Sequence, residues 1–517
     1  MFENEKPSIR FSMVGFGQAG SRIANEFAKF NHKGENGTIT NSYPVFAFNS
    51  TERDFGGLDN IPKANLVSLN LDGFGKEPTK AYQKLKSTPE YYNSVEEMVD
   101  KAYKAADELI IFNAGLGGGT GTSTVLLATQ IFIKKYVQEV IEKYTKQLIE
   151  ANGFDYEDFM TDPNYANNPE VMNSLYSRAE AAAENAGELK KLGLILAYPK
   201  RTDGPGVLKE VNRFIEMIWK LVLSSQNRIA FMLPVDNQKA SDDYAEHKSD
   251  LKFETYRDYI NHTIAAQLHE LNCATNIGGS DVTFDAQDFR KCILEHQGTL
   301  VIGKNVKSVS EVNGSNGLYK SLTDAWISGH NLHDKIEWEV EQNGKTAYHT
   351  VYNVGLLTIV NSEVVEEKKI NTSYLDDTQD KLSSELSLYG DCKVFTGQIE
   401  SKDIDKNVYS YTFAKTQALP NRLSTGLVEE YEQYKERTKQ EVFVTGEIKS
   451  LNESGELSPK KVYTFEDPFA VNKSNSNDDF LSAATKSNTQ SDEEKKEKKK
   501  QAFLDSLVNG DNNPFGI

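Results

Sequence analysis

The stretch 111–123, which reads IFNAGLGGGTGTS, has five glycines within seven residues, from Gly115 to Gly121. It follows the apolar run 109–112 and precedes the apolar segment 124–133, so the pattern predicts a strand, a turn and the start of a helix. Glycine has no Cβ to hold a ligand away, and free N–H groups at a helix N-terminus attract anions. The predicted chemistry is phosphate binding, although a tight strand-to-helix connection without a ligand would use the same glycines. The candidate contacts are Gly117, Gly118, Gly119, Thr120, Gly121 and Thr122.

Comparison with known phosphate-binding loops limits which kind of loop this stretch forms. A Walker A loop requires G-x-x-x-x-G-K-[ST], and the nearest match, Gly344-Lys345-Thr346, has Glu339 where the first glycine belongs. The sequence GGGTGTS instead resembles the signature loop of the tubulin/FtsZ superfamily, GGGTG[TS]G, with Ser123 in place of the last glycine. The resemblance implies an α/β fold, in which a long central helix joins a Rossmann-like GTP-binding domain to a smaller α+β activation domain. It also implies GTP or GDP as the ligand, with Mg²⁺ bridging the phosphates.

A second glycine-rich turn, GFGQAGS at 15–21, lies between a predicted strand and a predicted helix. The same GxGxxG spacing occurs in dinucleotide-binding units, which also require an acidic residue at the end of the next strand. Here the next strand, 45–48, ends in Asn49, so an NAD-dependent oxidoreductase is the weaker alternative. The sequence GFGQAGSR resembles the first phosphate loop of the TubZ branch of the superfamily. This resemblance adds Gly17, Gln18, Ala19, Gly20 and Asn49 to the nucleotide contacts.

Three further loops follow predicted strands and complete the expected nucleotide site. The turn with Gly73 and Gly75 resembles the loop that senses the γ-phosphate in the superfamily, but it also fits a plain surface turn. Asp203 precedes a glycine, as does the acid that holds ribose in the superfamily; alternatively, it caps a helix at 205–223. The side chain of Asn237 offers both an amide donor and an acceptor, and the guanine edge also presents both.

A long amphipathic segment at 250–275 has apolar side chains at helical spacing. It resembles the central helix that links the two domains of tubulin-like proteins. By the same resemblance, Phe253 or Tyr256 would stack on the base and Asp258 would contact it. Each of these residues is equally compatible with a place in the core or on the surface.

Carboxylates follow the central helix. Asp281, Asp285 and Asp288 lie within eight residues, just after a glycine pair and with no basic residue among them. The stretch resembles the catalytic loop of the superfamily, in which Asp285 and Asp288 would reach the nucleotide of the next subunit. A carboxylate at that place orients the water that attacks the γ-phosphate. Asp285 also fits the N-cap of a helix at 286–296, and one residue is able to do both jobs.

This division of the site has a consequence for assembly. If one subunit supplies the phosphate loops and its neighbour supplies the aspartates, GTP hydrolysis is completed only at the subunit junction. Head-to-tail contacts of this kind are heterologous and generate open filaments. The resemblance therefore implies a GTPase that forms cytomotive filaments and has a role in plasmid or phage DNA segregation. An FtsZ-like role in cell division is the nearest alternative.

The chain has 517 residues, which is enough for several domains. A polar helical region near 136–191 is predicted to be an outward elaboration of the first domain. The tail has a linker rich in Ser, Asn and Asp and the charge run DEEKKEKKK, which is typical of disordered segments. The predicted divisions are a GTP-binding domain (1–249), the central helix (250–275), the catalytic loop and activation domain (276–418), an extended C-terminal helix (419–440) and a disordered, flexible tail (441–517).

Net charge and the distribution of apolar residues limit the possible partners and the location of the protein. The net charge of −18 argues against strong direct binding to nucleic acid, so we expect a DNA-binding adaptor that is recruited by the tail. The N-terminus lacks a signal-peptide core and no apolar run reaches the roughly 18 residues of a membrane span, so a cytoplasmic protein is expected. Three cysteines and eight histidines show no metal-ligand spacing, so no metal site made by the protein alone is expected.

Overall fold

The computed structural model describes residues 2, 5–34, 36–249, 251–277, 282–327, 332–386, 388 and 390–440. The predicted flexible tail, 441–517, lies outside these residues, as do the glycine pair and Asp281 of the predicted catalytic loop. Within the described ranges, no helix is long and apolar enough to cross a membrane.

A ten-stranded sheet runs through the described chain in the order β13-β12-β14-β9-β8-β7-β6-β1-β4-β5. The part from β5 to β8 is parallel throughout, which confirms the predicted Rossmann-like arrangement. Its central strands are buried on both faces, as their uninterrupted apolar runs require. The strands of the parallel part are β1 (Ser12–Phe16), β4 (Val45–Asn49), β5 (Leu66–Ser68), which is the half-buried edge strand, β6 (Leu109–Gly115), β7 (Lys191–Tyr198) and β8 (Ile229–Asp236).

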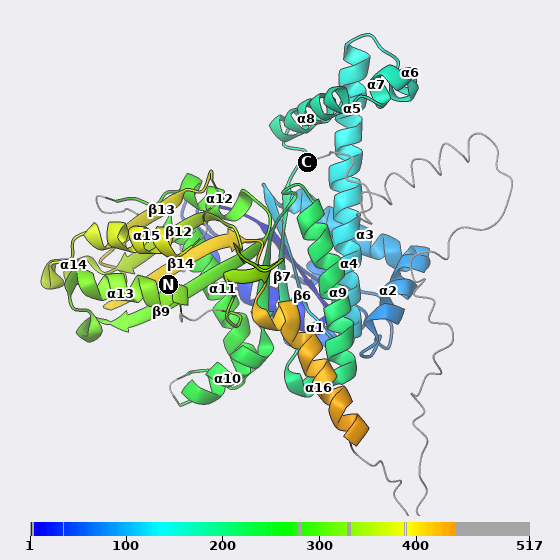
Figure 1. Cartoon of the computed structure of the whole chain (residues 1–517). Helices are drawn as coiled ribbons and strands as arrows, with labels where there is room; N and C mark the ends of the chain where they lie inside the picture. The colour runs from blue at the N-terminus through cyan, green and yellow to red at the C-terminus, as the bar shows by residue number, and fades with distance from the viewer. Residues whose placement is uncertain are drawn as a thin grey trace, which may run out of the picture.

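Helices cover both faces of the parallel part and form two separate apolar cores (Figure 1). The first core lies under α1 (Gly17–Phe27), α10 (Asn237–His247), α11 (Tyr256–Ala274) and α12 (Ala286–Leu294). The second core lies under α2 (Pro78–Ser87), α3 (Pro89–Ala105), α4 (Gly119–Ile131) and α9 (Pro205–Ser224). A small hairpin, β2 (Asn31–Lys33) and β3 (Ile39–Asn41), follows α1.

One helix continues far beyond the sheet. After α4 the chain passes through a π-helical turn, η3 (Phe132–Gln138), into α5 without a break. The segment 139–185, which we call the arm, stands away from the body of the molecule (Figure 1). Three ion pairs anchor its base: Lys143 pairs with Glu188 at 2.7 Å, and Arg228 pairs with Glu180 and, at 2.6 Å, with Glu184. The arm is made of α5 (Glu139–Ala151), α6 (Tyr156–Thr161), α7 (Pro163–Ala166) and α8 (Pro169–Asn185).

The central helix is shorter than the sequence predicts. The expected helix spans 250–275, but α11 begins at Tyr256 because the Thr255 hydroxyl accepts a hydrogen bond from the Asp258 N–H at 3.2 Å. Phe253 therefore precedes the helix instead of lying in its first turn. The other end of α11 is fixed by Asn272, whose side-chain oxygen accepts a hydrogen bond from the Ile9 N–H at 2.7 Å.

The second half of the chain adds four strands to the same sheet, with α13 and α15 packed beside them. The strands of this part of the sheet run in mixed directions, since β14 pairs antiparallel with β9 and β12, whereas β12 and β13 are parallel. A single register pair, Met232 with Thr299, joins β8 to β9. The elements are β9 (Thr299–Ser308), α13 (Gly314–Ile327), the hairpin β10 (Glu339–Gln342) and β11 (Lys345–Tyr348), β12 (Val351–Val360), α14 (Ser362–Lys368), α15 (Ser373–Glu385), β13 (Val394–Glu400) and β14 (Asn407–Thr416).

The predicted C-terminal helix follows the last strand. It opens with a π-helical turn, η6 (Arg422–Gly426), and continues as α16 (Leu427–Gln440). It packs against α9 through Leu427, which is fully buried in the second core. The helix therefore belongs to the parallel half of the fold, although it ends the described chain.

Candidate functional site

Two glycine-rich helix N-termini meet at the carboxyl edge of the parallel sheet. A Cβ built on Gly17, the first residue of α1, would lie 2.7 Å from the backbone nitrogen of Gly121 in the first turn of α4. A Cβ on Gly20 would lie 2.3 Å from the carbonyl oxygen of Asn113 in β6. Only glycine permits these approaches, so both helices direct their N-terminal N–H groups to one place.

Two other predicted loops join them. The N–H of Gly119 donates to the carbonyl of Gly75 at 2.8 Å, which fixes the turn with Gly73 and Gly75 against the start of α4. The hydroxyls of Ser50 and Thr120 lie 2.6 Å apart, so the end of β4, with Asn49, borders the same cradle. Sequence analysis missed Ser50. Its place directly after Asn49, at the end of a buried strand, could have indicated it.

Some of the predicted contact residues border open space, whereas others point into the protein. A Cβ on Gly118 would meet no atom within 4 Å, and the same holds for Gly73 and Gly75. Gln18 and Ala19 are likewise exposed. Thr122 instead points inward, because its buried hydroxyl accepts a hydrogen bond from the Gly117 N–H at 2.9 Å and so shapes the loop from behind.

The buried amide of Asn49 is a further sign of a ligand. Its oxygen accepts a hydrogen bond from the Ser50 N–H at 2.8 Å, whereas its nitrogen has no hydrogen-bond partner among the described residues. An orphaned donor of this kind is costly unless a ligand or water supplies an acceptor. The cradle as a whole offers donors and open space, which suits a polyanion such as a nucleotide phosphate.

The loops predicted to hold ribose and guanine lie next to each other. The carboxylate of Asp203 accepts a hydrogen bond from the Lys200 N–H at 2.9 Å and closes a short turn, η4 (Arg201–Asp203). It does not cap α9, whose N-cap is Gly204. The Arg201 N–H donates to the side chain of Gln238 at 3.1 Å, which brings this loop beside Asn237, the half-buried first residue of α10.

The three further residues predicted to contact the base do not lie together in the structure. The ring of Tyr256 lies 4.9 Å from the Lys200 ammonium, so it borders the Asp203 loop. Phe253 packs instead on Tyr259 and His262, with ring centroids 5.8 and 5.2 Å away. The carboxylate of Asp258 accepts the Thr255 hydroxyl at 2.7 Å. Of the two aromatic candidates, Tyr256 is the one that the structure places beside the predicted ribose loop.

The two candidate catalytic aspartates form a capping box at the start of α12. The Asp285 carboxylate accepts hydrogen bonds from the N–H groups of Gln287 and Asp288 at 2.7 and 3.0 Å, and Asp288 accepts from the Asp285 N–H at 3.2 Å. The N-cap alternative for Asp285 is thus confirmed, for a helix that ends at Leu294 and not at 296. Partial burial raises the pKa of Asp288, and the neighbouring Asp285 carboxylate raises it further.

This aspartate pair lies at the opposite edge of the sheet from the cradle. The Arg290 side chain of α12 donates to the carbonyl of Ser8, just before β1, at 2.6 Å. Lys191, which begins β7, donates to the carbonyl of Leu294 at 2.8 Å. The strands between the two edges, such as the seven residues of β6, span roughly 20 Å. One chain therefore does not bring its aspartates to its own cradle.

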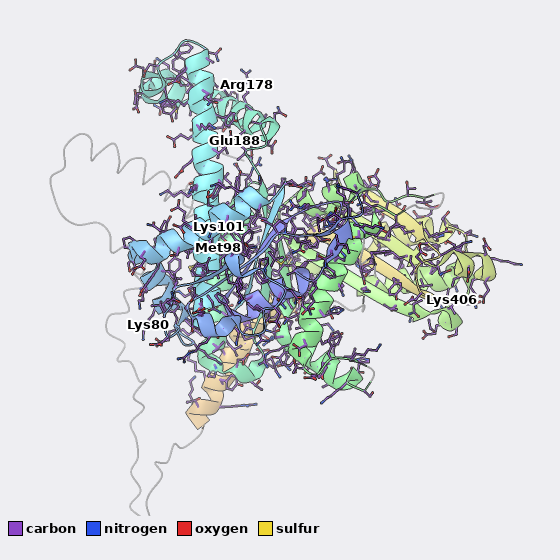
Figure 2. All side chains as sticks on the ribbon, turned by 180° about the vertical axis from the view of Figure 1, so that it is seen from behind. Lys80, Met98, Lys101, Arg178, Glu188 and Lys406 are labelled. Atoms are coloured by element: carbon purple, nitrogen blue, oxygen red, sulfur yellow. The ribbon has the colours of Figure 1, made fainter. Side chains whose placement is uncertain are left out.

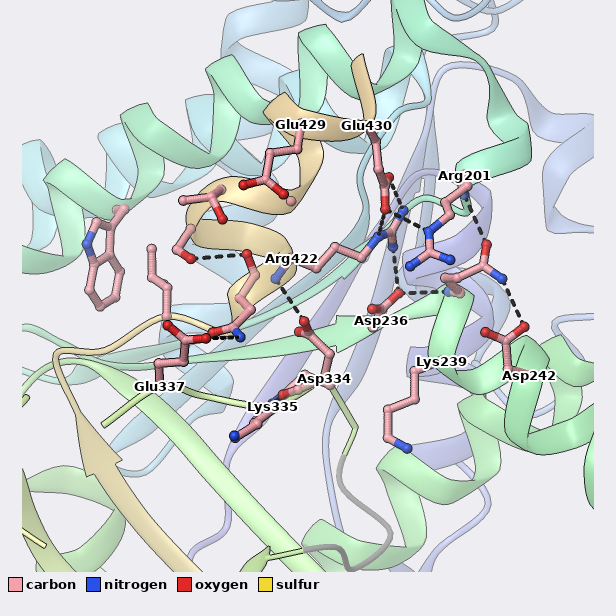
Figure 3. A pocket seen from close by; sticks show the side chains of 18 of the residues that line it. Arg201, Asp236, Lys239, Asp242, Asp334, Lys335, Glu337, Arg422, Glu429 and Glu430 are labelled. Carbon is pink, nitrogen blue, oxygen red and sulfur yellow. Dashed lines mark hydrogen bonds and ion pairs between the residues drawn. The ribbon is translucent and has the colours of Figure 1, made fainter. Parts of the chain in front are cut away.

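A partly buried ionic network ties the predicted ribose and guanine loops to the C-terminal helix (Figure 3). The Arg422 guanidinium pairs with Asp236 at 2.6 Å and with Glu430 at 2.9 Å, and Glu430 also pairs with Arg201 at 2.8 Å. These groups line a cavity of about 1480 Å³ that also contains Asp334 and is separate from the glycine cradle. Burial raises the pKa of Asp334 to about 6. Sequence analysis missed the network because its members lie far apart in the sequence, with Asp236 and Arg422 separated by 186 positions.

Arg422→Ala should therefore destabilise the fold strongly. The substitution leaves Asp236, of which only 2% is exposed, without its partner, and an uncompensated buried charge costs about 3–5 kcal/mol. The matched control is Arg201→Ala, because that side chain is 61% exposed and contacts the same Glu430; its loss should cost no more than about 1 kcal/mol. Urea unfolding of both variants measures the difference. Equal destabilisation by the two substitutions would contradict the assignment.

Comparison with known proteins finds relatives that share the fold. Tubulin-like protein TubZ of Bacillus cereus is 22% identical to the chain over 442 residues, which cover 84% of this chain and 85% of TubZ. A GTPγS-form protofilament of Bacillus thuringiensis serovar israelensis TubZ superposes with a TM-score of 0.59 at 18% identity, covering 84% of this chain and 95% of that one. The chain thus resembles the tubulin-like protein TubZ in sequence and shares its fold.

A second tubulin-like protein shares the fold. The GDP-bound monomer of CetZ1 from Haloferax volcanii has a TM-score of 0.53 at 15% identity, and the match covers 83% of this chain and 100% of CetZ1. No family model matches the chain.

Proposed function

We propose that this chain belongs to the tubulin/FtsZ superfamily, that it binds and hydrolyses GTP, and that hydrolysis takes place where one copy of the chain meets the next. The observation that carries the proposal is the separation of the site into two halves, a phosphate cradle at one edge of the sheet and Asp285 with Asp288 at the other. Stacking the copies head to tail places the aspartates of one copy over the cradle of its neighbour. Because the two contacting surfaces differ, the assembly is an open filament.

GTP and GDP are the ligands that best fit the cradle. The relatives include TubZ protofilaments in GTPγS and GDP forms, and members of the superfamily are GTPases. The converging N–H groups around Gly17, Gly118 and Gly121 suit phosphates, while Asp203, Asn237 and Tyr256 lie where ribose and base would follow. The remaining candidates are Gln18, Ala19, Gly20, Asn49, Gly73, Gly75, Gly117, Gly119, Thr120, Thr122, Phe253 and Asp258.

A magnesium ion would share this site. Among the described residues, no group of three or more His, Cys, Asp or Glu side chains is arranged to hold a metal. Mg²⁺ takes few protein ligands when phosphates are present, so the nucleotide and water would supply most of its ligands. When bound, the ion would neutralise charge on the phosphates.

The protein's own groups divide the hydrolytic work. The N–H groups at the starts of α1 and α4 orient the phosphates and stabilise the negative charge that develops on them. Asp285 or Asp288 of the adjacent copy accepts a hydrogen bond from the attacking water and orients it in line with the γ-phosphate. The raised pKa of Asp288 favours proton acceptance there.

The cellular role that fits best is the segregation or positioning of plasmid or phage DNA. One solved relative is a type III plasmid segregation TubZ, and TubZ also forms two-stranded and four-stranded filaments. The net charge of −18 disfavours direct contact with DNA, so a DNA-binding adaptor recruited by residues 441–517 would carry the cargo. A filament with a role in cell division is the second candidate. The comparisons give no support to an NAD-dependent oxidoreductase.

Polymer should therefore sediment with GTP or GTPγS and Mg²⁺, but not with GDP. Phosphate release per subunit should rise steeply above a threshold protein concentration, because only junctions hold complete sites. Light scattering and a phosphate assay across a protein dilution series test this directly. Release at a constant rate per subunit at all concentrations would overturn the shared-site proposal.

A further inference from the structure

The arm extends across the surface that the proposed junction needs. It leaves the sheet at the amino edge, where Tyr136 donates its hydroxyl to Asp100 near the end of α3 at 2.7 Å. This is the edge that carries Asp285 and Asp288. From there α5 alone has 13 residues, which add about 20 Å in the direction away from the cradle. Figures 1 and 2 show the arm from two sides, and in both views it projects well past the end of the sheet.

The helix α2 lies at the other end of the same flank. The arm is the continuation of α4, and α2 packs against α4 next to the cradle, where Gly119 bonds to Gly75. Its N-terminal Thr79 is also hydrogen-bonded to Glu210 of α9. Copies stacked head to tail in one orientation therefore bring the arm of one copy up to α2 of the next.

These two surfaces carry opposite charge. Between residues 147 and 177, at the tip of the arm, there are six acidic residues and no lysine, arginine or histidine. An aromatic cluster of Phe154, Phe159 and Tyr165 holds the tip together, and Phe154 remains 47% exposed. The helix α2 has three exposed lysines, Lys80, Lys84 and Lys86, and no acidic residue.

We propose that the tip of the arm binds α2 of the next copy of this chain in the filament. The proposal rests on the head-to-tail assembly proposed above, because it uses the same junction. Complementary charges steer the two surfaces together, and the exposed face of Phe154 adds apolar contact at the centre. The arm thus clamps the junction from outside, while the cradle and the aspartates meet within it.

A charge swap tests this contact. Glu157→Lys with Asp158→Lys reverses two exposed arm residues that do not cap a helix, and Lys80→Glu with Lys86→Glu reverses two exposed residues of α2. Each pair of substitutions alone should raise the critical concentration for GTP-dependent assembly roughly threefold to tenfold, and combining all four should restore it. The matched control is Glu366→Lys with Glu367→Lys on α14, which should change nothing.

The outcomes separate the two proposals. If the wild-type protein does not polymerise with GTP, the proposed function fails. If it polymerises and the arm variant assembles at an unchanged critical concentration, the function stands and the arm proposal is overturned, which would leave a basic adaptor as the partner of the tip. A defect that the α2 reversal does not rescue also overturns the pairing. Circular dichroism of each monomer with GDP shows whether the variants remain folded.

Discussion

Phosphate release should fall by about 100-fold or more in Asp288→Asn and in Asp285→Asn, while the filaments persist. The amide keeps the shape of the side chain and, at position 285, its ability to cap α12, so the substitution removes the carboxylate and little else. Without a carboxylate to accept its hydrogen bond, the attacking water is no longer oriented. A phosphate-release assay and electron microscopy of the assembled protein measure the two effects. The matched control is Asp376→Asn, an exposed aspartate in the first turn of α15.

A mixing experiment locates the defect at the junction. Asp288→Asn subunits retain an intact cradle, whereas subunits with a blocked cradle, such as Gly118→Val, retain intact aspartates. An equal mixture should recover about a quarter of the wild-type rate, because one head-to-tail junction in four pairs the two intact halves. No recovery in mixtures that co-sediment, or normal phosphate release in both aspartate variants, would rule out a site shared between subunits.

Gly118→Val should weaken GTP binding by about 10- to 100-fold without destabilising the protein. The backbone of Gly118 is extended, with φ −82° and ψ 159°, and a Cβ there meets no protein atom within 4 Å. The valine side chain would instead occupy the space where phosphates approach the N–H groups, at a cost of charge-assisted hydrogen bonds. Titration with a fluorescent GTP analogue measures affinity, and thermal unfolding without nucleotide measures stability.

Gly20→Ala is the matched contrast. Its Cβ would lie 2.3 Å from the Asn113 carbonyl oxygen, so the nucleotide-free protein should lose about 1–3 kcal/mol of stability through overpacking. The two glycines thus lack a side chain for different reasons. Gly118 leaves space for a ligand, whereas Gly20 leaves space for the neighbouring backbone. If Gly118→Val binds GTP as tightly as the wild type, the phosphates do not lie where the cradle implies.

The parallel half of the fold could be predicted because its signals are local. A strand, a glycine-rich turn and a helix follow one another within 111–133, and each step has its own residue preference. The carboxyl ends of parallel strands meet at one edge, so loops predicted separately, with Gly17, Gly75 and Gly118, come together without further information.

Other features could not be predicted, because they depend on contacts between residues that are far apart in the sequence or on local details that the sequence pattern does not indicate. Asp236 and Arg422 are 186 residues apart in the sequence, and nothing near either residue indicates that they pair. The start of α11 was missed because apolar spacing continues upstream of Thr255, and the cap overrides it. The course of the arm depends on the π-helical turn that keeps α4 and α5 continuous, which sequence does not reveal.

The joint between β8 and β9 has a mechanical consequence. Every other neighbouring pair of main-sheet strands is joined by at least three register pairs, but these two share only Met232 with Thr299. Rotating one half of the molecule against the other therefore breaks fewer backbone hydrogen bonds there than anywhere else in the sheet. Load transmitted along a polymer would be absorbed at this hinge, and its angle would set how straight or curved a row of subunits becomes.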